Sequence, residues 1–422
     1  MKSNLVNQSP VFEGSRAVVA SDADIREFRA NMLVVRNQRR SFLTRLRQSV
    51  GHRLSIPLAV SYGFQGIRRY GRSVKKRYNI GLFRQFQYLS LDHLSYRMLP
   101  ESFYMYQQYL TENRGSSAKH FDFLQVLPMQ QYLIDRAKCE DYPLLRSKHL
   151  FARRCSEIGL PSIPLLAEFA DGRMIFHSVG GETTLPRVDL FSKPSEYWCG
   201  IGANLWTHNE HGRYSNALSG ESYDKDGLIK KLCADSKTGR IVLQERVSNH
   251  SAMVGSITSG GLATIRFVTC RSPSGSIDFL PPVIRMPIAG AIVDNIAQGG
   301  LAAPVDIATG KICGPAIQKD KRLGISKFEK HPDTGVEFVG IQLLFWREVL
   351  DLAMQAHLAF PSMYFVGWDI AILKDRPVVL EGNSWWDVDL TILPNRISLS
   401  DTQFIPYYNY HLRSITSAAK KD

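Results

Sequence analysis

The sequence predicts an α+β protein in which a helical, basic N-terminal region precedes a larger part that is rich in strands. Apolar residues at helical spacing predict the helical region, which extends to about residue 140. Short β-rich segments separated by glycine-containing turns, with a few helices between them, predict the α+β part. The chain has 422 residues, more than one ordinary domain contains. Its composition, with 44% hydrophobic and 22% charged residues, excludes general disorder.

The N-terminal region carries the whole excess of positive charge. The chain has 52 Lys and Arg against 39 Asp and Glu, which gives a net charge of +13. Fourteen of these cations, and no acidic residue, lie between Glu27 and Asp92. Ile25 and Phe28 begin an apolar series at helical spacing. We expect residues 29–84 to bind an anionic membrane surface or an acidic partner, with a solvated face packed on an acidic neighbour as the alternative; nucleic acid is disfavoured.

The chain shows no sign of a membrane-spanning or secreted protein. No run of 18 or more apolar residues is present, and the N-terminus lacks the apolar core of a secretion signal. The six cysteines are far apart and include no CxxC pair, which favours free thiols and argues against structural zinc. We therefore expect a cytoplasmic protein whose basic segment can hold it at the inner face of the membrane.

The strand-rich part begins with a helix. Ser147 is suited to cap a helix that ends at Ile158, and Gly159 follows at a position typical of helix termination. A second helix is predicted over 340–360. Strands are predicted at RVDLFSK, RIVLQERV, LATIRFVTC, SIDFLPPVIRM, FVGWDIAIL and RPVVLEGN.

The segment 364–389 is the most informative part of the chain. Two β-rich runs flank a polar turn and predict an antiparallel hairpin. If the turn centres near Asp375, Asp369 lies opposite Glu381, and Asn383 points to the same face. Adjacent carboxylates repel each other, and carboxylate and amide oxygens suit Mg²⁺. The spacing leaves two alternatives open, a magnesium site or a solvent-facing hairpin with incidental acids.

This hairpin, together with the segments before it, resembles the ATP-grasp superfamily. In that family, a strand Asp and a Glu-x-Asn pair on the next strand bind the magnesium of MgATP. The segments LPESFYMYQQYL, TIRFVT and VDN resemble more narrowly the sugar-transfer-associated ATP-grasp group. The resemblance covers about 147–400 and implies an ATP-grasp fold, two α+β subdomains that clamp ATP and Mg²⁺. We expect the helical region at 1–140, the subdomain with the phosphate loop at 141–243 and the subdomain with the metal site at 244–422.

The resemblance also implies a set of nucleotide-binding residues. The motif around Lys148 resembles the lysine that opens the ATP-binding region, and Lys193 resembles the strand lysine before a flexible loop over the phosphates. LQERVSN resembles the adenine hinge, although Gln stands where many members carry Glu. A lysine in an apolar strand is costly to bury unless it meets an anion or extends to the surface. The implied residues are Lys148, Lys193, Gly200, Gly202, Gln244, Glu245 and Val247.

Candidate catalytic residues lie between the hinge and the hairpin. Arg266 and Arg285, on adjacent predicted strands, are suited to stabilise a transferring phosphate or to form structural ion pairs, and we favour Arg285 for catalysis. Asn295 is the expected polar contact in a turn on the substrate side. The resemblance implies an ATP-dependent carboxylate–amine (or thiol) ligase that acts through an acyl phosphate on small-molecule substrates and is linked to polysaccharide or peptide modification.

Two other functions stay open at this point. One is an ATP-dependent kinase of a sugar or lipid-linked sugar alcohol, since one fold supports several reactions. The other is a polyanion- or membrane-binding protein with a regulatory nucleotide site.

Overall fold

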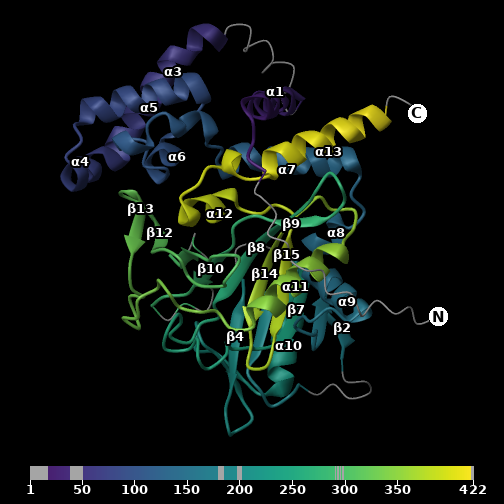
Figure 1. The fold of residues 1–422 in the computed structure, drawn as a ribbon. Helices are drawn as coiled ribbons and strands as arrows, with labels where there is room; N and C mark the ends of the chain where they lie inside the picture. The colour runs from purple at the N-terminus through teal and green to yellow at the C-terminus, as the bar shows by residue number, and fades with distance from the viewer. Residues whose placement is uncertain are drawn as a thin grey trace.

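A computed structural model of the chain contains a helical region and two β-sheets (Figure 1). None of the helices in the described residues combines the length and apolar character needed to cross a bilayer. The structure describes residues 18–38, 51–178, 185–196, 202–289, 291, 294, 296 and 299–419, with only the backbone of 51–55.

The first helix, α1 (Asp22–Gln38), has the apolar face that the sequence predicts. Phe28 and Val35 are fully or almost fully buried. The helix packs on α7 (Phe123–Ala137) and α13 (Phe404–Ala418), which ties the start of the described chain to its end. The residues Leu43, Leu46 and Val50, which continue the predicted helical pattern, lie outside the described part of the chain.

The helices that follow form a separate lobe with its own core of aromatic and aliphatic side chains. Tyr104 reaches Gly324 on the neighbouring sheet so closely that a Cβ there would lie 2.5 Å from the Tyr104 carbonyl carbon. Gly324 also has φ +86°, so a side chain at this position would be strained as well as crowded. The lobe comprises α3 (Gly51–Gly66), the π-helical η1 (Ile67–Gly71), α4 (Arg72–Tyr78), α5 (Leu82–Tyr96) and α6 (Pro100–Met105).

Two short helices lead from the lobe into the strand-rich part. Helix α9 (Lys148–Ile158) has the predicted bounds, and Gly159 closes it in the left-handed conformation. Ser147 occupies the N-cap position, but its hydroxyl bonds His149 and Ser195 instead of a backbone N–H. The other elements between α6 and the first strand are η2 (Thr111–Asn113), η3 (Ser116–Lys119), α7 and α8 (Tyr142–Arg146).

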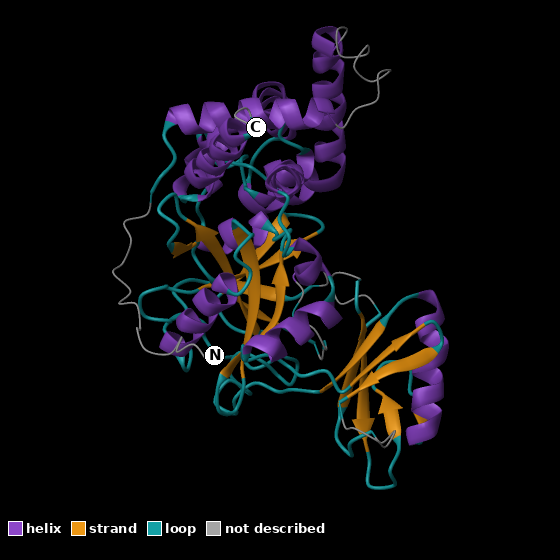
Figure 2. Ribbon diagram, turned by 90° about the vertical axis from the view of Figure 1, so that its right-hand side faces the viewer, coloured by secondary structure: helices purple, strands orange, loops and turns teal. Residues whose placement is uncertain are grey.

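The first sheet has seven antiparallel strands in the order β2-β1-β7-β3-β4-β5-β6. Helix α10 (Lys225–Asp235) packs on it, and Figure 2 shows this sheet and its helix as a unit set apart from the rest. The short 3₁₀ helix η4 (Ser236–Thr238) leads into β7. The strands are β1 (Ala167–Ala170), β2 (Arg173–His177), β3 (Leu190–Pro194), β4 (Asn204–His208), β5 (Tyr214–Asn216), β6 (Ser222–Tyr223) and β7 (Ile241–Glu245).

The second sheet has eight strands, in the order β13-β12-β11-β10-β8-β14-β15, with β9 paired to β8. One face packs on α8, α9 and α11 (Trp346–Leu358), and the other on α1, α7, α12 (Val388–Asn395) and α13. The 3₁₀ helix η6 (Leu399–Asp401) precedes α13. The strands are β8 (Thr264–Arg271), β9 (Ile277–Phe279), β10 (Val283–Met286), β11 (Leu301–Pro304), β12 (Ala316–Asp320), β13 (Gly324–Phe328), β14 (Phe365–Ile372) and β15 (Pro377–Asn383).

The helix predicted over 340–360 is shorter than expected, because α11 begins only at Trp346. The preceding residues make backbone hydrogen bonds to another segment: Ile341 O accepts from Ile312 N, and Leu343 N donates to Gly310 O. Phe345 then adopts the left-handed conformation, which marks the start of the helix. The boundary that we expect at 243/244 falls inside β7 and stays a prediction.

Candidate active site

The hairpin of β14 and β15 has the register that the sequence predicts at its carboxylates. Asp369 pairs with Glu381, and Gly367 pairs with Asn383. A bulge follows, because Ile370 pairs with Val379 and leaves one extra residue on β15. The register predicted from a turn centred near Asp375 is therefore confirmed at Asp369 and Glu381. Between the bulge and the turn, the prediction is wrong by one residue.

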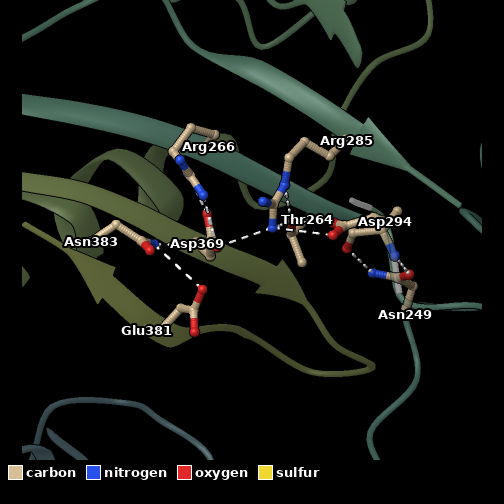
Figure 3. Close-up of polar contacts among 9 residues, drawn as sticks. Asn249, Thr264, Arg266, Arg285, Asp294, Asp369, Glu381 and Asn383 are labelled. Carbon is tan, nitrogen blue, oxygen red and sulfur yellow. Dashed lines mark hydrogen bonds and ion pairs between the residues drawn. The ribbon is translucent and has the colours of Figure 1, made fainter. Parts of the chain in front are cut away.

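Asp369 is held by two arginines from neighbouring strands (Figure 3). Arg266 on β8 lies directly opposite Asp369, and its Nε and Nη2 donate to the two carboxylate oxygens at 2.5 and 3.1 Å. Arg285 on β10 adds a contact of 3.0 Å from Nη2 to Oδ2. The carboxylate is almost completely buried. Its charge is thus offset by arginines, so repulsion from Glu381 does not by itself require a cation here.

Arg285 is oriented by a second acidic group, Asp294. Its Nη2 lies 3.1 Å from Asp294 Oδ1, and its Nε and Nη2 donate to the Thr264 hydroxyl at 3.0 and 2.7 Å. The same hydroxyl donates to Asp294 Oδ2. Arg285 therefore bridges Asp294 and Asp369 in a network that spans β10, β8 and β14 (Figure 3).

The pKa values follow from this network. Burial raises the pKa of Asp369, but Arg266 and Arg285 lower it to about 2, so this carboxylate stays ionised. Burial raises the pKa of Asp294 to about 6 although Arg285 opposes the shift. Burial lowers the pKa of Arg285, but Asp294, Asp369 and Glu381 together raise it above its ordinary value. Arg285 is therefore a permanent, fixed positive charge.

Lys193 of the first sheet interacts electrostatically with these carboxylates and with Lys148 at the start of α9. Lys193 lies on β3, and Lys148 begins α9, with its backbone N–H donating to Ser195 O at 3.0 Å. Burial, and to a lesser extent Lys148, lower the pKa of Lys193 to about 8, although Glu381 and Asp369 oppose the shift. These electrostatic interactions show that Lys193 of the first sheet lies near Lys148 of α9 and near the carboxylates of the second sheet.

Glu381 and Asn383 are the oxygen-bearing groups least occupied by protein contacts. Both are half-buried, and the Asn383 amide lies 3.5 Å from Asp369 Oδ2 and 3.5 Å from Glu381 Oε1. Two carboxylates and one amide fit Mg²⁺, which is usually held by one or two carboxylates plus phosphates. The described residues contain no group of three or more His, Cys, Asp or Glu side chains that could hold a metal without other ligands.

The predicted adenine hinge lies where β7 leaves the first sheet. The Gln244 carboxamide is buried and donates to Ile163 O at 2.7 Å, so its side chain holds the loop before β1. Glu245 is exposed at the end of the strand. Val247 packs on a small apolar cluster with Ala371 of β14 and other residues of the hairpin.

The phosphate loop and the turn around 294–300 are only partly described. Gly202 has φ +76° and is the first residue that the structure describes after residues 197–201 of the loop. Gly200 and Asn295 lie outside the described residues, so their predicted roles stay predictions.

Sequence reasoning missed three residues that the structure brings to the site. Asp294 and Thr264 orient Arg285, and Asn249 fixes the segment between the sheets. Asn249 donates to Ala263 O at 2.9 Å and accepts from Ala263 N at 2.7 Å (Figure 3). Asp294 begins the turn that we expect on the substrate side, where the sequence favours Asn295 as the polar contact.

The profile of a known family, described as sugar-transfer associated ATP-grasp, matches residues 129–404. The chain belongs to this family. The match includes both sheets and the residues of the network around Asp369, so the predicted resemblance and ATP-grasp fold are confirmed. No curated protein matches this ATP-grasp chain.

Solved structures with a similar fold include other ATP-grasp proteins. D-alanine–D-alanine ligase from Bacillus anthracis, complexed with ATP, is 11% identical over 65% of this chain and 68% of its own, with a TM-score of 0.37. N5-carboxyaminoimidazole synthetase from Staphylococcus aureus, complexed with ADP, is 11% identical over 63% of this chain and 52% of its own, with a TM-score of 0.36. Sequence identity and TM-scores this low give no information about the activity of this chain.

Proposed function

We propose that this protein is an ATP-dependent ligase that joins a carboxylate to an amine or thiol through an acyl phosphate. Membership of the ATP-grasp family supports ATP as the energy source. The observation that carries the proposal is the electrostatic interaction of Lys193, on the first sheet, with Lys148 of α9 and with Asp369 and Glu381 of the second sheet. Cations on one side and oxygen ligands on the other are what a magnesium-bound triphosphate requires.

The phosphate end of ATP would lie against Lys148, Lys193 and Arg285. Lys193 is half-buried with a lowered pKa, so an approaching phosphate would stabilise its charged form. Arg285 is fixed by Asp294 and Thr264 and needs no reorganisation when negative charge develops nearby. Arg266 is fully engaged by Asp369 and would act as a positioning residue.

The adenine end would lie at the hinge. The apolar cluster there combines Ile163, Ala371 and Val378 with half-buried Val247 and Leu380. Leu380 is the extra residue of the β15 bulge. Apolar side chains of this kind would provide a packing surface for the planar adenine base.

Magnesium, when bound, would supply charge neutralisation on the phosphates. Glu381 and Asn383 would hold it, with Asp369 as the third oxygen-bearing side chain. The two arginines lower the pKa of Asp369 to about 2, so it is ionised at neutral pH.

The reaction would proceed in two steps. An oxygen of the substrate carboxylate attacks the γ-phosphorus of ATP, an oxygen–phosphorus bond forms, and the bond to the bridging oxygen breaks to release ADP. The amine nitrogen then attacks the acyl carbon, a carbon–nitrogen bond forms, phosphate leaves and the amine loses a proton. Arg285 and Lys193 would stabilise charge on the phosphoryl group in the first step.

A screen of ADP release tests this proposal. Candidate acids (amino acids and uronic acids) are combined with amines, including amino sugars, in the presence of MgATP. We expect ADP release only when an acid and an amine or thiol are both present. ADP release with an alcohol and no acid would instead support the sugar kinase.

A further inference from the structure

The helical lobe carries an exposed apolar stripe on one face. In α3, Ile56, Val60 and Phe64 follow each other at intervals of four residues and therefore share one side of the helix. All three are exposed, and Phe64 is 64% exposed. Isolated exposed apolar residues are common on proteins, but three in one row need an explanation.

Helix α5 extends this stripe across the lobe. It packs beside α3, with the Ser90 hydroxyl donating to Ala59 O at 3.4 Å and the rings of Phe64 and Phe86 5.1 Å apart. Phe83 lies one turn before Phe86 on the same side of α5 and is 73% exposed. The exposed rings of Phe64 and Phe83 are therefore both neighbours of half-buried Phe86, the first across the α3–α5 contact and the second one turn away along α5.

The same lobe has a cationic end around α4. Residues 56–91 contain seven cations and no acidic residue, and all seven cations are exposed. None of the seven forms an ion pair within the described part of the chain. Among the described residues, none therefore provides an acidic neighbour at ion-pair distance for these seven cations. The seven are Arg68, Arg69, Arg72, Lys75, Lys76, Arg77 and Arg84.

We propose that the α3–α5 face is a docking surface for an anionic lipid bilayer. Apolar and aromatic side chains beside an uncompensated cluster of Lys and Arg are the combination that binds a membrane interface. The aromatic rings would enter the headgroup region while the cations of α4 contact lipid phosphates. Nucleic acid would attract the same cations but offers no environment for Ile56 and Val60.

The position of the lobe leaves the ligase site free. Figure 1 places α3, α4 and α5 at one end of the molecule, and the first sheet with α10 at the other. The lobe contacts the second sheet through α6 and β13, away from the hairpin of β14 and β15. A docked protein would therefore keep its nucleotide site exposed to solvent.

Vesicle flotation of the full chain tests the proposal. The probes are vesicles of phosphatidylglycerol and phosphatidylcholine in equal parts, and vesicles of phosphatidylcholine alone. We expect binding to the anionic vesicles that weakens as salt is added. Replacing Lys75 and Lys76 together by Ser should weaken binding about 25-fold, because each cation near an anionic surface contributes about fivefold. Phe83→Ser should weaken it about tenfold through lost apolar burial.

Matched variants on the opposite end of the molecule serve as controls. Replacing exposed Lys230 and Lys237 by Ser removes the same charge, and Leu218→Ser removes an equally exposed apolar side chain. Both controls should bind vesicles like the parent chain, and circular dichroism should show that every variant is folded.

Three results would overturn the proposal. The first is equal binding to neutral and anionic vesicles, and the second is unchanged binding of the Lys75/Lys76 variant. The third is no binding to vesicles together with binding of single-stranded RNA that depends on the same two lysines.

Discussion

Lys193 offers the most quantitative test of the proposed phosphate site. Its pKa is lowered from 10.5 to about 8, chiefly by burial, which corresponds to about 3 kcal/mol of preference for the neutral form. A triphosphate placed beside it would favour the charged form and raise this pKa. Binding of ATP above pH 8 should therefore take up a proton, whereas below pH 8 the lysine is already charged.

The size of the effect follows from the printed pKa. At pH 9 only about one molecule in ten carries a charged Lys193 before ATP binds, so affinity should be about tenfold weaker than at pH 7. Isothermal titration calorimetry in buffers of different ionisation enthalpy measures both the affinity and the proton uptake. We expect uptake approaching one proton at pH 9 and almost none at pH 7.

Lys193→Arg separates this group from every other titrating group. The guanidinium stays charged throughout this range, so the variant should show a flat affinity between pH 7 and 9. Lys230→Arg, on the exposed face of α10, is the matched control and should keep the pH dependence of the parent chain. An affinity for ATP that is already flat in the parent chain, without proton uptake, would refute the placement of Lys193 at the phosphates.

Three further predictions concern the second sheet and its connection to the first. Glu381→Gln should lower magnesium-dependent ATP turnover about 100-fold or more while the circular dichroism spectrum stays unchanged; a fully active variant would contradict the metal assignment. Turnover should fall as the pH drops through about 6, because protonation of Asp294 removes one of the two carboxylates that orient Arg285, and Asp294→Asn should have low activity that no longer falls at acid pH; a variant whose activity still falls at acid pH would assign the effect to another group. Asn249→Ala should lower the free energy of unfolding by about 1–3 kcal/mol in urea titrations, because the buried N–H and C=O of Ala263 lose their partner; unchanged stability would mean that the contact is dispensable.

The hairpin of the site was predictable from sequence because its partners are close along the chain. A short polar turn limits the register of the two strands to within one residue, and the bulge at Leu380 then brings Glu381 opposite Asp369. The bulge at Leu380 was not predictable, since no glycine or proline marks it in the sequence. The helix over 340–360 was overextended because the hydrogen bonds of its first residues go to a segment about 30 residues earlier.

The arginine network could not be derived from the sequence. Arg266 and Asp369 are 103 residues apart and meet only because β8 and β14 are neighbours in the second sheet. The sequence suggested two arginines on adjacent strands but gave no means to tell that both contact Asp369. The same limit applies to Lys193, whose pKa is lowered by burial while Glu381 and Asp369 of the other sheet oppose the shift.

The central claim is that this ATP-grasp protein activates a carboxylate. The most direct measurement is transfer of ¹⁸O from a labelled carboxylate substrate to the phosphate released with ADP, once the screen has found an active acid and amine pair. An acyl phosphate passes one carboxylate oxygen to phosphate when the amine attacks its carbon, so we predict that the released phosphate contains the label. Release of unlabelled phosphate, or transfer of the phosphoryl group to an alcohol, would contradict the account.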